Sequence, residues 1–408
     1  MAINVKFGSK IINLDTPANL EVLETRHPEY TIDKVTFTAS LQELLHRKKR
    51  DYSDVAIVVS DKTRLCGYEL YLPWLLEILS GEGVDKDNIS FYIAYGTHPK
   101  QSDQESLKSY GDTFLNYRFI HHDPNDESIL SDLGTTSRGT RILIRKDVLD
   151  SSLMITFGAI SHHYFAAYGG GRKLLFPGLA ARESVYQNHS LFLNFRERKL
   201  EEGCRPGNLD GNPLSDDLKE IDDLLPEKIS IHGILDNQGK VCQLHSGESY
   251  GDFLKVCNLH DSFYRSGLAV SFDMVVASSG GYPKDINFIQ GHKSVHHAAA
   301  FVKDGGKLLI FSECRDGIGN TGFLPLFREG GPEAVYKKLE IRYEGNGGTA
   351  LAMMSKTSRI SIFMVTDLDE ETCRLLDVHK TSFQEAQDLI HKNSGSIAFI
   401  PNASMLVK

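Results

Sequence analysis

One pattern recurs along this chain: a short apolar run ends in a polar or glycine-rich cluster, and a helical segment follows. Uninterrupted apolar runs of this length predict strands that are buried on both faces, and strands that alternate with helices predict parallel pairing. The fold class that we expect is therefore α/β with mostly parallel sheets. The runs stand at residues 55–59, 89–94, 153–157, 274–277, 307–311, 360–365 and 396–400.

The pattern stops after a helical segment near residues 253–263 and starts again at Met274. A chain of 408 residues is long enough for two such units. We therefore predict two α/β domains, over residues 1–267 and 268–408, with the active site in the cleft between them. Capping-box patterns predict further helix starts at Ser40, which would open a helix over 41–49, and at Ser102 and Ser382.

Polar side chains follow the first three predicted strands. Asp61 and Arg64 come after the first run, His98 comes after the second, and His163 comes after the third. Because the carboxyl ends of parallel strands meet at one edge of a sheet, we expect these side chains to converge on one crevice. Histidines beside cations favour a small anionic substrate and proton transfer near neutral pH.

The segment over residues 157–189 combines several uncommon features. Three glycines precede the basic pair Arg172 and Lys173, and a predicted helix then carries His189. Glycines let backbone N–H groups approach a phosphate, and a lysine there is suited to phosphate binding or to a covalent link. The spacing is not that of a P-loop, because no hydroxyl residue follows Lys173. A zinc hydrolase that uses His163 and His189 stays open as an alternative, although the chain has no H-E-x-x-H motif.

This segment resembles the nickel-dependent lactate racemase family. The central pattern of that family is a histidine, a run of small and aromatic residues, a glycine-rich turn with a basic pair, Pro-Gly, and a histidine on the next helix. Here residues 163–173 provide the first histidine, the turn and the basic pair. Pro177 and Gly178 follow, and His189 completes the pattern.

The resemblance implies a cofactor, the nickel-pincer nucleotide, which is a pyridinium-3-thioamide-5-thiocarboxylate mononucleotide that holds Ni²⁺. Lys173 would be its attachment point, and His189 would be the protein ligand to nickel. The segment contains no cysteine, so the sulfur donors that suit nickel would come from the cofactor. The other cofactor-binding residues that the resemblance implies are Asp61, Gly169, Gly170, Gly171 and Arg172.

The implied reaction is racemisation or epimerisation of a 2-hydroxy acid through a 2-keto acid. The hydrogen on carbon would leave as hydride to the cofactor, because its removal as a proton would place a second negative charge beside the carboxylate. His98 and His163 would transfer the hydroxyl proton, one on each face of the substrate. An arginine suits bidentate binding of the carboxylate. The substrate-binding residues implied by the resemblance are Arg64, Tyr282, Gln290 and Lys293, the last two on a predicted helix over 286–302.

The chain departs from the family at the edge of this expected site. Residues 65–67 are Leu-Cys-Gly where the family usually has prolines, and Pro99-Lys100 follow His98 where the family often has arginine. We therefore expect a hydroxy acid other than or larger than lactate, such as an aromatic, dicarboxylic or sugar acid. A non-catalytic cofactor-binding protein is a further alternative, and the presence of both His98 and His163 argues against it.

Composition argues against several other functions. A net charge of −9 disfavours a nucleic-acid surface, and no apolar stretch has the roughly 18 residues of a membrane span. Six dispersed cysteines without a C-x-x-C pair, and an N-terminus without a signal-peptide core, favour the cytoplasm. The expected partners are a small 2-hydroxy acid and the proteins that synthesise the cofactor, with no nucleic acid and no membrane.

Overall fold

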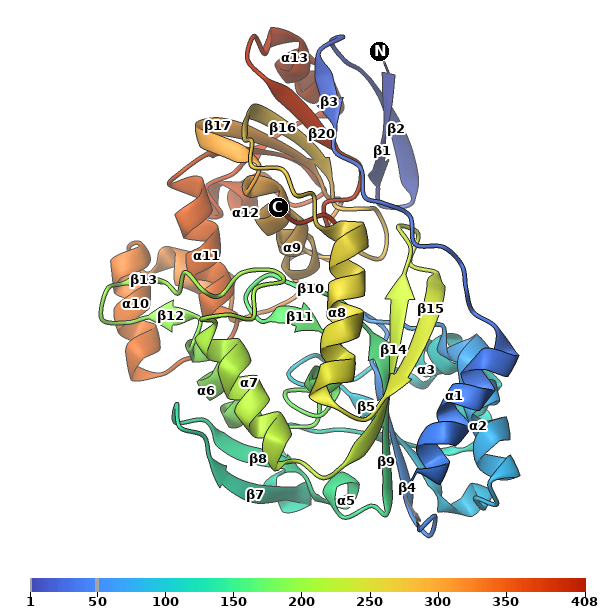
Figure 1. Ribbon diagram of the computed structural model, residues 1–408. Coiled ribbons are helices and arrows are strands. Elements are labelled where there is room, and N and C mark those ends of the chain that lie inside the picture. Colours follow the sequence, from blue (N-terminus) through green and yellow to red (C-terminus); the bar gives the residue numbers. More distant parts are fainter. Residues whose placement is uncertain (1, 48–50) are drawn as a thin grey trace.

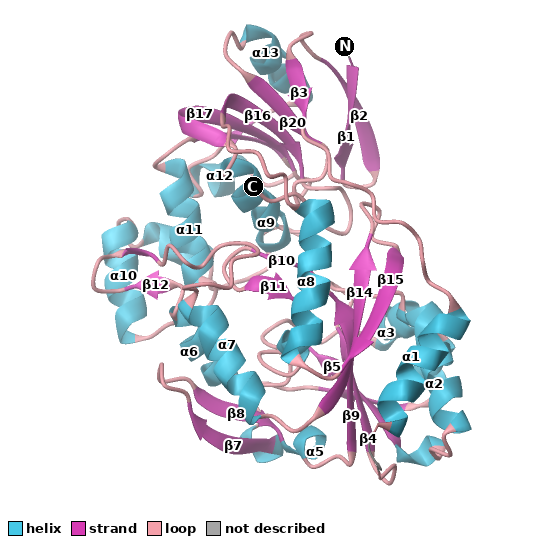
Figure 2. Ribbon diagram, in the orientation of Figure 1, coloured by secondary structure: helices cyan, strands magenta, loops and turns pink. Residues whose placement is uncertain are grey.

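The computed structural model describes residues 2–47 and 51–408, and these residues form two six-stranded sheets with helices around them (Figures 1 and 2). Parallel pairing dominates both sheets, so the predicted α/β class is confirmed. The first sheet has one antiparallel edge, where β15 returns along β14. Its strands, in spatial order, are β15 (Val241–Gly247), β14 (Lys228–Leu235), β9 (Leu153–Ala159), β4 (Val55–Ser60), β5 (Ile89–Ala94) and β6 (Arg118–His121).

The second sheet lies at the top of Figure 1, and its described strand pairs are all parallel. An antiparallel hairpin of β1 (Ala2–Phe7) and β2 (Lys10–Asp15) packs its apolar side chains on this sheet. The strands of the sheet, in spatial order, are β19 (His379–Lys380), β18 (Ser361–Val365), β17 (Val302–Phe311), β16 (Phe272–Ser278), β20 (Ile397–Ile400) and β3 (Leu20–Val22).

The chain therefore starts in the second sheet, crosses to the first, and returns after α8. The domain prediction placed the N-terminal residues in the first domain, whereas β3 pairs with β20 of the second sheet. The domain boundary between residues 267 and 268 stays a prediction. The N-terminal strands lie with the second sheet. A single apolar core contains residues from both sheets, including Val58 and Met154 of the first and Val275 and Leu308 of the second.

Side chains alternate across the strands of the first sheet, as the pleat requires. Val55, Ile57 and Val59 pack with α1 and α2, whereas Ala56 and Val58 face the opposite side. The elements around the first sheet are α1 (Lys34–His46), α2 (Tyr68–Gly81), α3 (Asp103–Tyr110), α4 (Asp112–Asn116), β7 (Leu130–Thr135), β8 (Arg141–Arg145), α5 (Lys146–Leu149), α6 (Arg182–Ser190), α7 (Pro213–Leu224) and α8 (Tyr250–Tyr264).

Helices also cover the second sheet. Two of the predicted capping boxes are confirmed, at Ser102 and at Ser382, whereas the one at Ser40 is wrong. α1 begins earlier because the side chain of Asp33 accepts a hydrogen bond from the backbone of Thr36, and residues 48 and 49 of that predicted helix lie outside the described residues. The helices of this part are α9 (Phe288–Ala299), α10 (Pro332–Ile341), α11 (Gly347–Thr357), α12 (Glu370–Leu375) and α13 (Phe383–Lys392).

The strands β14 and β15 were not predicted. Their runs include buried polar residues, such as Ser230 and His232, which interrupt the apolar pattern. Across the described ranges, 2–47 and 51–408, no helix has both the length and the apolar character needed to cross a membrane.

Candidate active site

The carboxyl-terminal edge of the first sheet gathers the predicted polar residues. β4 pairs in parallel with both β5 and β9, so their last residues lie at one edge. Asp61 and Arg64 follow β4, and His98 follows β5. After β9 the chain forms a short hairpin of β10 (Ser161–His163) and β11 (Ala167–Gly169), and the 3-10 helix η3 (Gly171–Leu174) follows. The parallel strands therefore bring these side chains together at the carboxyl-terminal edge of the sheet.

The buried carboxylate of Asp61 pairs with the half-buried imidazole of His98. The Asp61 Oδ2 and His98 Nδ1 atoms lie 2.6 Å apart, and Asp61 Oδ1 accepts two hydrogen bonds from Thr63. Burial alone would raise the pKa of Asp61, but the attraction and hydrogen bond of His98, with help from Thr63 and Arg64, lower it to about 2. The ionised carboxylate fixes the proton of His98 on Nδ1 and leaves a lone pair on Nε2. The sequence pattern placed both residues but did not reveal this pairing.

The hairpin of β10 and β11 carries His163, and it is anchored through its other face. His162 pairs in register with Tyr168, and both donate to Asp261 Oδ1 of α8, at 2.7 and 2.9 Å. Arg265 holds the other carboxylate oxygen of Asp261. Because side chains alternate along a strand, His163 then points away from α8. His162, which the sequence left without a role, is thus an anchor of this hairpin.

His162 and Asp261 also belong to a group of possible metal ligands. With His260, their ligand atoms lie within 4.8 Å of one another. The carboxylate of Asp261, however, already accepts hydrogen bonds from His162, Tyr168 and Arg265. The geometry is that of a hydrogen-bonded anchor.

His163 is held as a neutral imidazole. Its Nδ1 accepts a hydrogen bond from the backbone N–H of Ala166 at 3.3 Å, which places the proton on Nε2. Burial lowers the pKa of His163 well below its usual value, and repulsion from Lys173, Arg64 and Lys293 lowers it further. His98 and His163 thus present opposite groups, a lone pair and an N–H.

Four half-buried cations lie near these histidines: Arg64, Lys173, Lys284 and Lys293. Burial and repulsion from Arg64 lower the pKa values of all three lysines, and those of Lys173 and Lys293 fall well below the usual value. The ammonium of Lys293 donates to Gln290 Oε1 at 2.6 Å. Within the described part of the chain, no carboxylate forms an ion pair with any of the four. The cluster therefore has the charge of an anion-binding site.

His189 is the residue of α6 that faces this cluster. Burial and repulsion from Lys173 and Arg64 lower its pKa to about 3, so the imidazole is uncharged. The rings of His189 and Phe165 lie 5.0 Å apart, and the Lys173 ammonium lies 5.7 Å from the centre of the same Phe165 ring. The backbone of Val185, one turn earlier on α6, hydrogen-bonds to this imidazole and opposes the shift in its pKa, so one ring nitrogen is left for a ligand. A neutral imidazole with a free nitrogen is suited to bind a metal.

The position of α6 is fixed by the residue next to His189. Asn188 donates to Asp217 Oδ2 of α7 at 2.8 Å, and Thr140 donates to the same oxygen at 2.8 Å. Thr136 donates to Asp217 Oδ1. Asp217 is fully buried, so this network ties α6 to α7 and to the loop before β8.

The glycine loop is shaped by the packing of the chain itself. Gly170 has a φ of 78°, and a Cβ there would collide with the carbonyl oxygen of Ala159. A Cβ on Gly171 would lie 2.7 Å from the ring of Phe253, and one on Gly169 would lie 3.2 Å from a guanidinium nitrogen of Arg64. Glycine is therefore required at these three positions because β9, α8 and Arg64 pack closely against the loop. This requirement holds whether or not the loop also binds a ligand.

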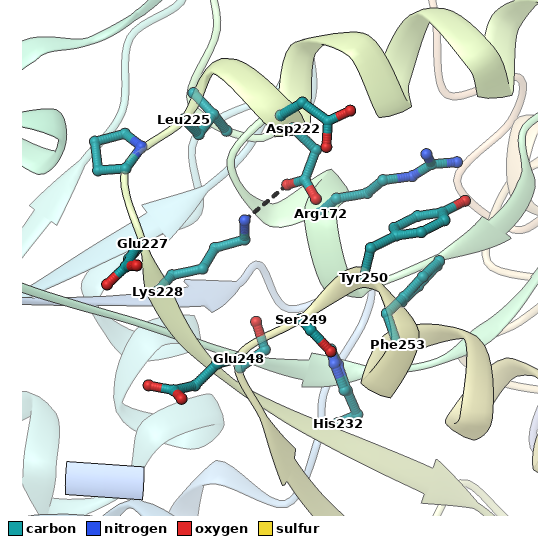
Figure 3. A pocket seen from close by; sticks show the side chains of 13 residues that line it. Arg172, Asp222, Leu225, Glu227, Lys228, His232, Glu248, Ser249, Tyr250 and Phe253 are labelled. Carbon is teal, nitrogen blue, oxygen red and sulfur yellow. Dashed lines mark ion pairs between the residues drawn. The ribbon is translucent and has the colours of Figure 1, made fainter. Parts of the chain in front are cut away.

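Two predicted site residues lie apart from the cluster. The Arg172 guanidinium donates to Ser215 Oγ at 2.6 Å and lies 5.4 Å from the centre of the Tyr250 ring. It lines a separate cavity of about 230 Å³, where Figure 3 shows it beside Tyr250 and Phe253. The Tyr282 side chain is 46% exposed, and its ring contacts the guanidinium of Arg315. The other predicted residues come together as expected.

Comparisons with known proteins agree with this arrangement. Residues 8–200 match the family model of the lactate racemase N-terminal domain, and residues 268–405 match that of the lactate racemase C-terminal domain. Lactate racemase of Thermoanaerobacterium thermosaccharolyticum is 30% identical over 305 residues, which cover 74% of this chain and 69% of that protein. The chain belongs to the lactate racemase family. Lactate racemase of Lactiplantibacillus plantarum is 27% identical over 319 residues, which cover 78% of this chain and 72% of that protein.

Solved structures show the same fold. The lactate racemase apoprotein of T. thermosaccharolyticum aligns with a TM-score of 0.84 at 24% identity, over 100% of this chain and 99% of that one. A Thermotoga maritima protein aligns with a TM-score of 0.72 at 16% identity, over 94% and 99% of the two chains. The lactate racemase family consists of nickel-dependent isomerases of 2-hydroxy acids, and the resemblance drawn from the sequence is confirmed at this level.

Proposed function

We propose that this protein is a racemase or epimerase of a 2-hydroxy acid that carries a nickel-pincer nucleotide on Lys173. The observation that supports it best is a cluster of cations that form no ion pair with a carboxylate in the described part of the chain, beside two histidines that present a lone pair and an N–H. A substrate carboxylate and a nucleotide phosphate would each supply negative charge to balance these cations. Membership of the lactate racemase family supports the reaction class.

The residues present fit such a cofactor. Burial and the neighbouring cations lower the pKa of Lys173, so its amine reaches the uncharged, nucleophilic form more easily, which suits a covalent attachment. His189 has one ring nitrogen that the backbone hydrogen bond with Val185 leaves available to a metal. The cluster contains no cysteine, so the sulfur donors that nickel prefers come from the nucleotide. When bound, the nucleotide would supply nickel and a group able to accept and return hydride.

The chain's own residues bind the substrate and move its proton. The Arg64 guanidinium and the Lys293 ammonium hold the carboxylate, and the hydrogen bond from Lys293 to Gln290 orients that ammonium. His98 Nε2 accepts the hydroxyl proton, and Asp61 stabilises the imidazolium that results. His163 Nε2–H donates a hydrogen bond to the oxygen of the planar 2-keto acid and keeps its proton, since a neutral imidazole that lost it would become an imidazolate. The proton that His98 took would return to this oxygen, and a 2-keto acid that received hydride on its other face would give the other stereoisomer.

The charge of the cluster changes as the site is loaded. Lys173, Arg64 and Lys293 keep His163 neutral by repulsion. Attachment of the nucleotide removes the charge of Lys173, and the substrate carboxylate neutralises another. Both changes raise the pKa of His163 towards the working pH, where a general acid and base is most effective.

The substrate that we propose is a hydroxy acid other than or larger than lactate. Support comes from the segment after Arg64, where the chain departs from the family. Cys66 is buried against Gly233, and Gly67 begins α2 with a φ of 61°, so this segment turns directly into the helix.

The test begins with protein made in a host that synthesises the cofactor. Intact mass and nickel content are measured for the wild type, for Lys173→Ala and for Lys255→Ala, which replaces an exposed lysine of α8. We expect an adduct of mononucleotide size and bound nickel in the wild type and in Lys255→Ala, and neither in Lys173→Ala. Wild-type protein without adduct and nickel contradicts the proposal.

Turnover in D₂O tests the hydride route separately. A hydrogen that is carried as hydride returns to carbon without exchange, so the racemised product contains no deuterium at carbon 2. Deuterium incorporated in step with racemisation shows proton abstraction and refutes the hydride route, even when the adduct is present.

A further inference from the structure

A buried glutamine joins the two loops that carry Asp61 and His98. Gln101 lies three positions after His98, before α3, and is only 1% exposed. Its side-chain oxygen accepts a hydrogen bond at 2.8 Å from the backbone N–H of Lys62, the residue next to Asp61. One side chain therefore connects the loop after β5 with the loop after β4.

The nitrogen of the same amide group is held by α3. It donates to the hydroxyls of Ser106 and Tyr110, at 3.0 and 3.4 Å. The Tyr110 hydroxyl in turn donates to the carbonyl oxygen of Ser60, the last residue of β4, at 2.8 Å. The backbone is thus held directly before Asp61 by Tyr110 and directly after it by the glutamine.

The His98 loop is closed around Tyr95. The backbone N–H of His98 donates to the Tyr95 carbonyl oxygen at 3.0 Å, and the backbone N–H of Gln101 donates to the Tyr95 hydroxyl at 3.3 Å. The same hydroxyl lies 2.7 Å from His121 Nδ1 on β6. The loop is therefore anchored on the sheet, and the Gln101 side chain is a direct hydrogen-bonded link from it to the backbone beside Asp61.

The chemistry of this position matches an amide group. An amide has one oxygen that accepts and two N–H bonds that donate. Here the oxygen faces the N–H of Lys62, and the two N–H bonds face the hydroxyls of Ser106 and Tyr110. Both hydroxyls already donate to backbone carbonyl groups, so they need a donor from residue 101. An apolar side chain would leave all three groups without this partner, so a glutamine fixes the two loops more firmly.

A second connection between the Asp61 loop and α3 is weaker. The side chain of Lys62 forms an ion pair with Glu105, but each of these side chains is 42% exposed. Exposed ion pairs contribute little, because water screens them and the long side chains lose freedom. The Gln101 amide is therefore the connection that we expect to set the place of the Asp61 loop.

We propose that Gln101 is a positioning residue, which holds Asp61 and His98 at the distance that keeps the imidazole proton on Nδ1. Its effect on turnover rests on the proposed function, whereas its effect on this contact needs neither nickel nor nucleotide. The contact is short, at 2.6 Å, so a small shift of either loop weakens it. A shift of about 1 Å at a reacting group can lower the rate by about 100-fold.

The first experiment reads the tautomer of His98 by NMR, in protein made without the cofactor. Histidine is labelled with ¹⁵N, and the chemical shifts of the ring nitrogens show which of them carries the proton. The His98 signals are identified from their loss in His98→Ala. We expect the proton on Nδ1 in the wild type. In Gln101→Met and in Gln101→Ala, the population should shift towards Nε2–H, because a free imidazole in water favours that form.

Two further variants make the result specific. Ser106→Ala removes a hydrogen bond of the same amide but leaves its bond to Lys62, so His98 should keep the proton on Nδ1. Gln101→Glu keeps the oxygen that faces Lys62, and a carboxyl group withdrawn from water favours its neutral form, so this variant should restore the Nδ1–H tautomer. Urea unfolding shows that each variant is folded under the conditions of the measurement.

The second experiment measures racemisation by loaded enzyme. We expect Gln101→Met to lower kcat by about 10- to 100-fold. In an Asp61→Asn background, the same substitution should lower kcat by less than about threefold, because the contact that Gln101 positions is already lost. A merely structural role would lower kcat by the same factor in both backgrounds, and equal factors therefore overturn the proposal.

The outcomes separate this inference from the proposed function. Folded Gln101→Met that keeps His98 fully in the Nδ1–H form overturns the inference and leaves the proposed function standing. So does an equal change of tautomer in Ser106→Ala, which would assign the effect to the packing of α3. Loaded wild-type enzyme that racemises no hydroxy acid overturns the proposed function, and the tautomer of His98 still decides whether Gln101 holds the pair.

Discussion

The pairing of Asp61 with His98 leads to a sharp test, the substitution Asp61→Asn. Asparagine keeps the shape of the side chain, and its oxygen can still accept the hydrogen bonds of Thr63. Its amide group, however, donates towards His98 Nδ1 and so moves the imidazole proton to Nε2. In that tautomer, His98 cannot accept the hydroxyl proton of the substrate.

The size of the effect follows from the pKa of Asp61. A change from 3.8 to about 2 corresponds to about 2.5 kcal/mol in favour of the ionised carboxylate, part of which comes from His98. In Asp61→Asn, the charged form of His98 loses most of this stabilisation, so kcat falls by up to nearly 100-fold. The wrong tautomer adds to the loss, and removal of a carboxylate that orients a catalytic imidazole costs up to about 10⁴-fold. We therefore expect a fall in kcat of about 10²- to 10⁴-fold.

The assay is racemisation of the preferred hydroxy acid, followed by chiral chromatography from each enantiomer. The two directions must slow by the same factor in kcat/KM, because the enantiomers have equal free energies. KM should change less than about threefold, since Arg64 and Lys293 still hold the carboxylate. Asp103→Asn, at an exposed position at the start of α3, is the matched control and keeps full activity.

Stability gives an independent measurement of the same charge. Because the pKa of Asp61 is lower in the folded state, its contribution is complete above pH 3.8 and is lost as the pH falls through about 2. Asp61→Asn therefore unfolds at lower urea concentration at pH 7. An Asp61→Asn variant that keeps more than a third of the wild-type activity would refute this role of Asp61. This role is also refuted if the loss comes from a missing nucleotide adduct, which is the cofactor role that the sequence predicted for Asp61.

Three other substitutions test the surroundings of the site. Lys356 is buried with a pKa of about 7, so the free energy of unfolding should rise by up to about 5 kcal/mol between pH 7 and 10.5. Urea unfolding of Lys356→Met should lack this rise. Parallel pH profiles for the wild type and the variant would contradict this role of Lys356. His189→Ala should keep the nucleotide mass on Lys173 but lose nickel, measured by intact mass and elemental analysis; retained nickel excludes His189 as ligand. Asp217→Ala leaves three buried donors unpaired and should lower the free energy of unfolding in urea by at least about 2 kcal/mol. Asp216→Ala, at the neighbouring position whose side chain is 44% exposed, should lower it by less than about 1 kcal/mol. Equal losses would contradict a role for the network.

The sequence predicts the edge at which the site forms, because strand ends are visible as the ends of apolar runs. β5 has the predicted bounds, and Asp61, Arg64, His98 and His163 come together after their strands as expected. The pairing of Asp61 with His98 is not predictable in this way. A pattern of residues places a side chain at an edge, but hydrogen-bond partners depend on turns and rotamers that the pattern does not encode.

The glycine loop shows how a local motif can have two physical causes. Three glycines before a basic pair indicate a phosphate cradle, whereas the structure requires Gly170 and Gly171 for packing on Ala159 and on Phe253. The second contact joins residues more than 80 positions apart, so no local pattern contains it. Arg172 was expected to bind the cofactor because of the resemblance to the family. In a 3-10 helix, successive side chains are about 120° apart, so Arg172 and Lys173 point in different directions.

The net charge of the chain does not predict the sign of the charge at the site, and the topology explains why. The whole chain carries −9, yet its buried cluster is cationic. Arg64 comes from the first sheet, while Lys284 and Lys293 come from the turn and helix after β16 of the second. Their mutual repulsion therefore acts between the two sheets and opposes their packing. A bound anion removes that repulsion, so ligand binding and the packing of the sheets must stabilise each other.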